Sequence, residues 1–208
     1  MSALAHARLY GILDLGYVEQ DKIISTTEQL LLGGIDILQL RAKKLPHPEI
    51  LSIAKKIAPL VEASGIPFVI NDFAEIAQAC GAPGCHVGQD DGPLPETAIT
   101  GRSTHSLDQA EAAAKEGVDY IGFGPLYATP TKPGRKPIGL QDVAEVHRRL
   151  PEDFPIFCIG GIDQGSTLPE VIAAGARRVV IVSALLKATD IPAEIQGVKA
   201  LLPELLAG

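Results

Sequence analysis

Three polar side chains at every second position of one segment could bind a charged ligand. They are Gln39, Arg41 and Lys43, in the segment QLRAK. In an extended strand such residues project to the same side, and two cations beside an amide suit a polyanion such as a diphosphate. The alternative is a strand end that runs into a solvated loop, where Lys43 and Lys44 only keep the surface soluble.

Two carboxylates follow the next two apolar segments, at Asp72 and Asp91. Carboxylates near a cation cluster are explained by a shared Mg²⁺, which in proteins often joins one or two carboxylates to substrate phosphates. The alternative is structural, with Asp72 capping a helix and Asp91 in a turn that continues into Gly92-Pro93. Together with the opposing cations, the pair favours one Mg²⁺ per subunit, with the amide of Asn71 directed at phosphate oxygens.

A second, uncharged anion site is indicated near the end of the chain by Gly160-Gly161 and Val182-Ser183. Many barrels bind a phosphate monoester through backbone N–H groups at this place, although a Gly-Gly pair is also an ordinary turn. Two anion sites predict displacement of a diphosphate by a second phosphorylated substrate. No Ser/His/Asp set or activated Cys in the sequence offers a competing covalent route.

The elements that must position these residues form a repeating unit of an apolar strand followed by a helical segment. Helical spacing and end signals mark 48–64, 107–116 and 167–174. Eight such units in about 200 residues predict a single-domain (β/α)₈ TIM barrel over residues 1–208, with an open doubly wound sheet as the alternative. The expected strands are Leu9–Asp14, Asp36–Arg41, Pro67–Asp72, Cys85–Gln89, Arg102–Ser106, Asp119–Pro125, Pro155–Gly161 and Arg178–Leu185.

Two connections depart from the repeat. The fourth unit leaves room for little more than one helical turn, in DGPLPETAITG. The loop YATPTKPGRKPIG, from Tyr127 to Gly139, is long, basic and rich in Pro and Gly, where such loops usually have a few residues. It follows a strand, so in a barrel it would lie on the face where active sites are built. We therefore expect it to act as a mobile lid.

Composition restricts the partners. The 208 residues carry a formal net charge of −7, which argues against a nucleic-acid binder because there is no broad basic face. No apolar run approaches the roughly 20 residues that a membrane span needs. With no leader-like start and with Cys80, Cys85 and Cys158 expected to be reduced thiols, we expect a cytoplasmic protein whose partners are small molecules. A homo-oligomeric state stays open.

The motifs together resemble the thiamine-phosphate synthase family. Its pattern appears in order as QLRAK, ND, GCHVGQDD, STHS, GPLYATPTK, GGI and VS, over residues 39–183. The resemblance implies condensation of hydroxymethylpyrimidine diphosphate with thiazole phosphate, in its carboxylate form, to thiamine phosphate and pyrophosphate. Diphosphate would leave first, and the thiazole nitrogen would capture the resulting pyrimidine cation.

The resemblance also implies residue roles. Asp72 and Asp91 would hold Mg²⁺, and Arg41, Lys43, Ser103 and Lys132 would be catalytic, with Lys132 arriving as the lid closes. The substrate-binding residues would be Gln39, Leu40, Arg41, Ala42, Lys43, Asn71, Ser103, Thr129, Thr131, Lys132, Gly161, Val182 and Ser183.

Two departures keep other functions open. Arg102 precedes Ser103 where the synthases often have an apolar residue, and GRSTHS also resembles the paralogous thiazole tautomerase, in which a histidine at the position of His105 acts on the thiazole ring. That enzyme has no need of QxRxK, ND and TxTK together, so the synthase is favoured. A non-catalytic phosphate-binding barrel is the third alternative. His86, between apolar residues, is expected to be structural.

Overall fold

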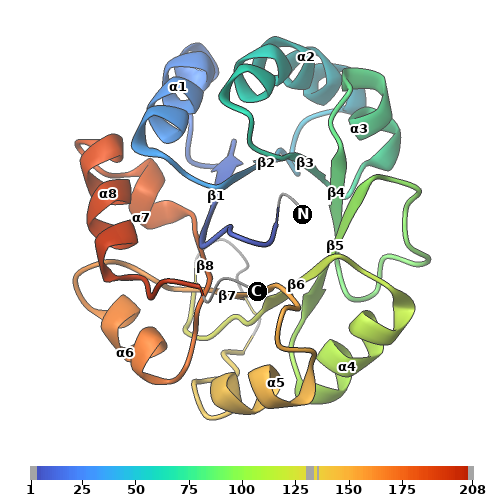
Figure 1. The fold of residues 1–208 in the computed structure, drawn as a ribbon. Coiled ribbons are helices and arrows are strands. Elements are labelled where there is room, and N and C mark those ends of the chain that lie inside the picture. The colour runs from blue at the N-terminus through green and yellow to red at the C-terminus, as the bar shows by residue number, and fades with distance from the viewer. Residues whose placement is uncertain (1–3, 130–133, 135, 206–208) are drawn as a thin grey trace.

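Eight parallel strands close into a barrel in which each strand pairs with its neighbours in sequence and β8 pairs with β1. A computed structural model describes residues 4–129, 134 and 136–205. Seen along its axis, the barrel is a ring of strands enclosed by helices (Figure 1). The strands are β1 (Leu9–Asp14), β2 (Ile37–Arg41), β3 (Phe68–Asn71), β4 (Gly84–Val87), β5 (Ile99–Thr104), β6 (Tyr120–Phe123), β7 (Ile156–Ile159) and β8 (Val179–Ile181).

The strands are buried on both faces, as a parallel sheet covered by helices requires. Alternate residues enter different cores. In β2, Leu38 and Leu40 belong to the large cluster that also contains apolar helix residues, whereas Ile37 belongs to the smaller cluster with Tyr10, Tyr120 and other strand residues. The period-two pattern in the sequence therefore reflects one row facing the helices and one row filling the barrel.

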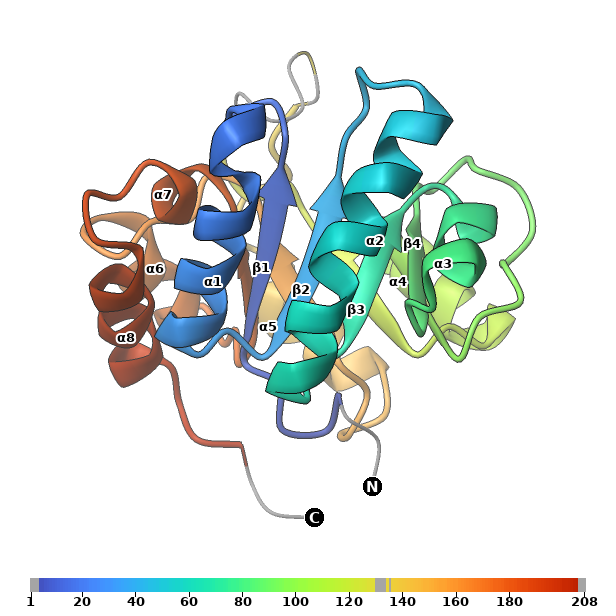
Figure 2. The same ribbon diagram turned by 90° about the horizontal axis from the view of Figure 1, so that it is seen from above.

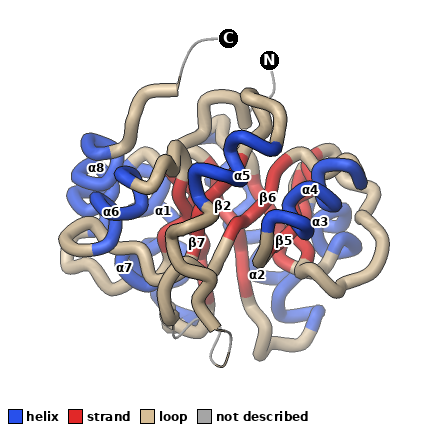
Figure 3. The backbone as a smooth tube through the Cα atoms, turned by 90° about the horizontal axis from the view of Figure 1, so that it is seen from below, coloured by secondary structure: helices blue, strands red, loops and turns tan. Residues whose placement is uncertain are grey.

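Helices cover the outside of this barrel (Figure 3). The residues at the helix ends act as caps, as helix 107–116 shows. At its start the side chain of Ser106 accepts a hydrogen bond from the backbone N–H of Gln109, and at its end Gly117 adopts a φ of 94°. The helices are η1 (Gln20–Lys22), α1 (Ile23–Gly33), α2 (His47–Ser64), α3 (Ala74–Cys80), α4 (Leu107–Glu116), α5 (Val143–Arg149), α6 (Thr167–Ala173), α7 (Ser183–Leu186) and α8 (Ile191–Leu201).

The predicted barrel and the weak fourth unit are confirmed, since residues 88–98, all of them described, form neither a helix nor a strand. One element was wrong. The sequence predicts a strand over Arg178–Leu185, but β8 ends at Ile181, and the chain turns at Val182 (φ −117°, ψ −83°) into the short helix α7. An apolar run of this length does not distinguish strand from helix.

The amino-terminal segment closes one end of the barrel. Leu4 and Ala7 are buried with the inner core residues. The guanidinium of Arg178 donates to the carbonyl oxygens of Leu4 (2.9 Å), Ala5 (3.0 Å) and Ala7 (2.5 Å). Figure 2 shows this segment at the end of the barrel opposite the arrowheads of β1 and β2. The carboxyl ends of the strands are therefore the open face.

The three cysteines are free thiols, as expected. Burial raises the pKa of Cys158 to about 12, and burial is also the main reason why the pKa of Cys85 rises to about 12. Both thiols are therefore protonated at neutral pH and unreactive. Among the described residues, none of the helices is both long and apolar enough to cross a bilayer.

Candidate active site

Two cavities open side by side at the carboxyl ends of the strands. The first, here called the apolar cavity, has a volume of about 320 Å³, and the second, the charged cavity, about 740 Å³. They are adjacent because five residues line both: Arg41, Asn71, His86, Ser103 and His105. One ligand could thus place a ring in the first cavity and a polyanion in the second.

The charged cavity contains the cations and carboxylates that the sequence singled out. Arg41, at the end of β2, forms an ion pair with Asp14 at the end of β1, and Asp14 is only 3% exposed. Fixing the guanidinium in this way orders its remaining N–H donors. The ammonium of Lys43 lies 3.4 Å from the carboxylate of Asp72 and is half exposed.

Asp72 has an unusual backbone conformation. Its φ is +68°, the only positive φ at a non-glycine residue in the described part of the chain. Its N–H donates to the carbonyl of His86 across the β3–β4 gap at 2.9 Å. Asp tolerates the left-handed region better than most residues. Asp72 lines the charged cavity, and the N-cap position of α3 is Phe73, with no side-chain cap hydrogen bond.

The loop that carries Asp91 is held from below by Arg102 of β5. This guanidinium is 3% exposed and donates to the carbonyls of Gly88 (2.9 Å), Gln89 (3.3 Å) and Gly92 (2.8 Å). It also lies 3.0 Å from the carboxylate of Glu116. Asp91 in turn accepts from the N–H of Gly88 at 2.6 Å. Arg102, the departure from the family pattern, therefore fixes the geometry of loop 88–92.

The carboxylates fit a magnesium ion that takes most of its ligands from substrate and water. Asp72 and Asp91 line the same cavity. Within residues 4–129, 134 and 136–205, no group of three or more His, Cys, Asp or Glu side chains could hold a metal alone. Two carboxylates with a diphosphate is a usual set of Mg²⁺ ligands, since this ion keeps waters and is rarely caged by protein alone.

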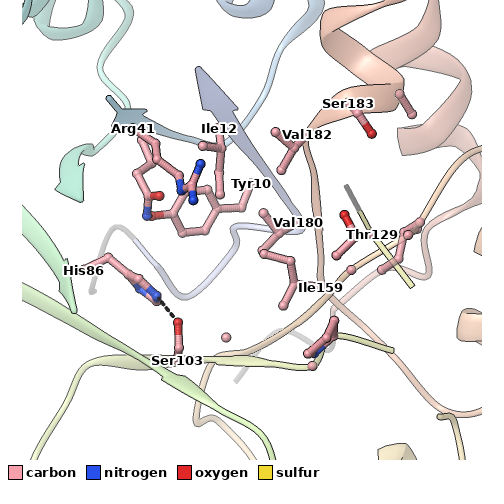
Figure 4. A pocket seen from close by; sticks show the side chains of 18 of the residues that line it. Tyr10, Ile12, Arg41, His86, Ser103, Thr129, Ile159, Val180, Val182 and Ser183 are labelled. Carbon is pink, nitrogen blue, oxygen red and sulfur yellow. Dashed lines mark hydrogen bonds between the residues drawn. The ribbon is translucent and has the colours of Figure 1, made fainter. Parts of the chain in front are cut away.

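The apolar cavity is walled by side chains from opposite sides of the barrel (Figure 4). His86 and Ser103 lie on one side, joined by a hydrogen bond of 3.0 Å, whereas Thr129, Val182 and Ser183 lie on the other. Tyr10, Ile12, Ile159 and Val180 contribute ring and aliphatic surface between them. This arrangement suits a flat ring held between polar groups.

The far side of that cavity is built from backbone. Gly160 (φ 103°) and Gly161 (φ 68°) follow β7, and a Cβ at Gly161 would lie 2.7 Å from the Cβ of Tyr127. Only glycine fits there, so the backbone itself lines the cavity. The expectation of a site without charge is incomplete, because Lys187 and Asp163 also line this cavity.

The structure brings most of the predicted site residues to the two cavities, although this alone does not assign their roles. Leu40 and Ala42 are exceptions: their side chains are buried in the outer core, on the other face of the chain from Gln39 and Arg41. Thr131 and Lys132 lie outside the described residues. The residues brought together are Gln39, Arg41, Asn71, Ser103, Thr129, Gly161, Val182 and Ser183 at the apolar cavity, and Arg41, Lys43, Asn71, Asp72, Asp91 and Ser103 at the charged one.

Asp14, Tyr10, Tyr120 and His86 are among the residues in or beside the site that sequence reasoning missed. Asp14 is a carboxylate at the end of β1, just as Asp72 follows β3, so its position in the sequence could have identified it. Tyr10 and Tyr120 look like core aromatics, and they are buried, but their hydroxyls reach the cavity floor. His86 was expected to be structural, yet it lines both cavities. Its position is visible only once the barrel is closed.

Comparison with known proteins gives a consistent result. A family model described as thiamine monophosphate synthase matches residues 9–185. Thiamine-phosphate synthase of Thermus thermophilus is 43% identical over 173 residues, covering 80% of this chain and 82% of that protein. That of Gloeobacter violaceus is 41% identical over 194 residues, covering 90% of this chain but only 55% of the relative, so the chain spans about half of that longer protein.

Solved structures agree. Thiamine phosphate pyrophosphorylase from Pyrococcus furiosus superposes with a TM-score of 0.84 at 26% identity, covering 96% of each chain. A 3-hexulose-6-phosphate synthase superposes with a TM-score of 0.68 at 17% identity, over 94% of this chain and 100% of that one. The second likeness concerns the barrel fold alone.

Proposed function

Because the chain belongs to the thiamine monophosphate synthase family, we propose that it is the transferase that joins hydroxymethylpyrimidine diphosphate to thiazole phosphate. The products are thiamine phosphate and pyrophosphate. The observation that carries this proposal is the shared wall between a charged cavity and an apolar one. A substrate made of a ring and a diphosphate needs both.

The diphosphate lies in the charged cavity in this proposal. Arg41 and Lys43 neutralise its oxygens, and Asn71 donates its amide to them. Asp72 and Asp91 hold the Mg²⁺, which when bound supplies further positive charge on the leaving group. Lys132, on the connection after β6, adds a further cation. The ion pair with Asp14 keeps Arg41 oriented before substrate arrives.

The reaction asks for charge stabilisation and positioning more than for proton transfer. The C–O bond to diphosphate breaks, and the electron pair leaves with the pyrophosphate oxygens, whose charge the cations stabilise. The pyrimidine methylene cation remains in the apolar cavity, and the thiazole nitrogen then forms the new C–N bond. Thiazole phosphate is positioned by Thr129, Thr131, Gly161, Val182 and Ser183 so that its nitrogen faces that carbon.

Pyrophosphate release with both substrates, with and without Mg²⁺, tests the proposal. We expect release only when both substrates and the metal are present, with thiamine phosphate formed in equal amount. Stoichiometric binding without release would identify a phosphate-binding barrel instead and would overturn the proposal.

An isomerase acting on the thiazole ring is the second candidate, because His105 lines both cavities and its Nδ1 contacts the carbonyl of Gly124. That activity would appear as conversion of thiazole phosphate alone, with no pyrimidine substrate. We expect none.

A further inference from the structure

A continuous row of hydrogen bonds crosses the floor of the apolar cavity. Gln39 Nε2 donates to the hydroxyl of Tyr10 (2.8 Å), and the hydroxyls of Tyr10 and Tyr120 lie 2.9 Å apart. The Tyr120 hydroxyl then lies 3.1 Å from Nδ1 of His86, whose Nε2 lies 3.0 Å from Oγ of Ser103. The row joins β2, β1, β6, β4 and β5. Its two ends, Gln39 and Ser103, line the apolar cavity and are among the substrate-binding residues that the family resemblance implies.

The direction of the protons along this row follows from its first bond. Each phenol has one proton, and burial raises the pKa of both Tyr10 and Tyr120 well above the ordinary value, so both stay neutral. Tyr10 accepts from Gln39, and each hydroxyl of the row then has one donor and one acceptor partner if the proton of Tyr10 goes to Tyr120 and that of Tyr120 goes to Nδ1 of His86. The proton of His86 is then on Nε2 and is donated to Ser103.

We propose that this row makes Tyr10, Tyr120 and His86 positioning residues that fix opposite hydrogen-bonding character at the two ends. At one end the Ser103 hydroxyl becomes a donor into the cavity, and at the other the carbonyl oxygen of Gln39 is an acceptor. A ring nitrogen suits the donor, and an exocyclic amino group suits the acceptor. The row thereby selects an aminopyrimidine over its oxo analogue, an inference that rests on the proposed function and extends it to specificity.

The residues around Tyr10 and Tyr120 fix the positions of the two phenol rings. A Cβ at Gly101 of β5 would overlap the ring of Tyr120, so glycine at that position makes the slot in which the phenol lies. The ring of Phe157 packs edge-on against both phenols, with centroids 5.4 Å and 5.7 Å away. Tyr10, Tyr120 and Gln39 are each no more than 2% exposed. The hydrogen bonds of the row are therefore shielded from bulk solvent, which strengthens them.

The two proton orders are mutually exclusive along the whole row. If the Gln39 amide were turned over, its oxygen would accept from Tyr10, and every later bond would reverse. His86 would then carry its proton on Nδ1, and Ser103 would be an acceptor. The tautomer of one histidine consequently reports on the character of both ends.

The first test is the tautomer of His86 in the full-length, substrate-free protein, measured by ¹⁵N NMR of the imidazole at neutral pH and assigned with the His86→Gln variant. We expect the proton on Nε2. A proton on Nδ1, or on both nitrogens, would overturn the proposed direction. Because no substrate is present, this result does not depend on whether the chain is a synthase.

The second test cuts the row in its middle with Tyr120→Phe. We expect a mixture of His86 tautomers and a roughly 10-fold smaller preference, in kcat/KM, for the aminopyrimidine diphosphate over its 4-oxo analogue. Phe157→Leu is the matched control, since it disturbs the same ring cluster without removing a hydroxyl, and it should keep both the tautomer and the preference. Unchanged preference in a folded Tyr120→Phe protein, checked by its thermal melt, would refute the role in specificity.

Discussion

The two sides of the barrel mouth hold anions by different means. On the side of β2–β4, charged side chains gather around one cavity: Arg41, Lys43, Asp72 and Asp91. On the side of β7–β8, glycine backbone and apolar side chains line the cavity, and Lys187 is the cation that contributes. The difference matches the two tasks in the proposed reaction. Charge that develops during bond breaking needs positioned cations and a metal, whereas a phosphate that only docks is held by backbone N–H groups.

The sharpest way to break this comparison is to remove a carboxylate from the charged side. Asp72→Asn keeps the size of the side chain and the tolerance of φ +68°, but it weakens the metal site. We expect a loss of at least about 10²-fold in kcat, because transition-state charge is no longer balanced. Steady-state pyrophosphate release measures it.

Asp108→Asn, at the start of α4 and away from both cavities, is the matched control and should turn over like the unmodified protein. Normal turnover in Asp72→Asn as well would remove Asp72 from the mechanism.

The backbone side is tested with Gly161→Ala. A methyl group there meets Tyr127 and forces strain at a positive φ, so the cradle is displaced. We expect about a 10-fold higher KM for thiazole phosphate, the order expected from loss of a hydrogen bond to a charged group. The KM for the pyrimidine diphosphate should hardly change. Gly165→Ala, in the same loop with ordinary space around its Cβ, is the control.

Equal effects on both substrates would mean that the two sides are not separate sites. That outcome would contradict the division of the mouth into a charged and a backbone half.

A smaller effect on activity is expected from a substitution of Arg102, which holds loop 88–92 on the charged side. Arg102→Met removes three bonds to the carbonyls of loop 88–92. We expect faster hydrogen exchange of the amides in that loop and a several-fold weaker response to Mg²⁺, together with a loss of about 2 kcal/mol in the free energy of unfolding, because three part-buried carbonyls lose a charged donor. Exchange mass spectrometry and a magnesium titration measure these effects.

Glu116→Gln is the comparison variant, since it weakens the ion pair with Arg102 but leaves the carbonyl bonds in place. It should leave exchange in loop 88–92 unchanged. If Arg102→Met exchanged no faster than Glu116→Gln, the clamp would have no effect on the loop.

The smallest change is expected from His105→Ala. His105 lines both cavities, but the proposed reaction does not require it to transfer a proton. We therefore expect less than about a threefold change in kcat. Complete loss of coupling in a folded variant would show that His105 takes part in the reaction, and conversion of thiazole phosphate alone by the unmodified protein would then distinguish the isomerase.

More of the charged side of the site than of the backbone side could be predicted from the sequence. The residue types of Arg41 and Asp72 indicate their chemistry, and their positions at the ends of parallel strands place them on one rim of the barrel. The fold followed from the eight repeated units. Side-chain type does not reveal that Arg41 is already paired with Asp14.

The other parts of the site depend on closure of the barrel. Tyr10 and Tyr120 are 110 positions apart, and only closure brings their hydroxyls within 2.9 Å. For the same reason His86 could not be distinguished from a core histidine. The turn after Ile181 into α7 was missed because an apolar run has no periodicity that separates strand from helix over so few residues.

The central claim is that one rim of the barrel concentrates positive charge and a divalent ion around a departing pyrophosphate. A crystal structure of the protein with pyrophosphate and Mg²⁺ tests it most directly. We expect Arg41 and Lys43 on the pyrophosphate oxygens, and Asp72 and Asp91 joined to them through the ion. Pyrophosphate bound at Gly161 and Ser183 instead, or a metal that contacts neither carboxylate, would contradict the account.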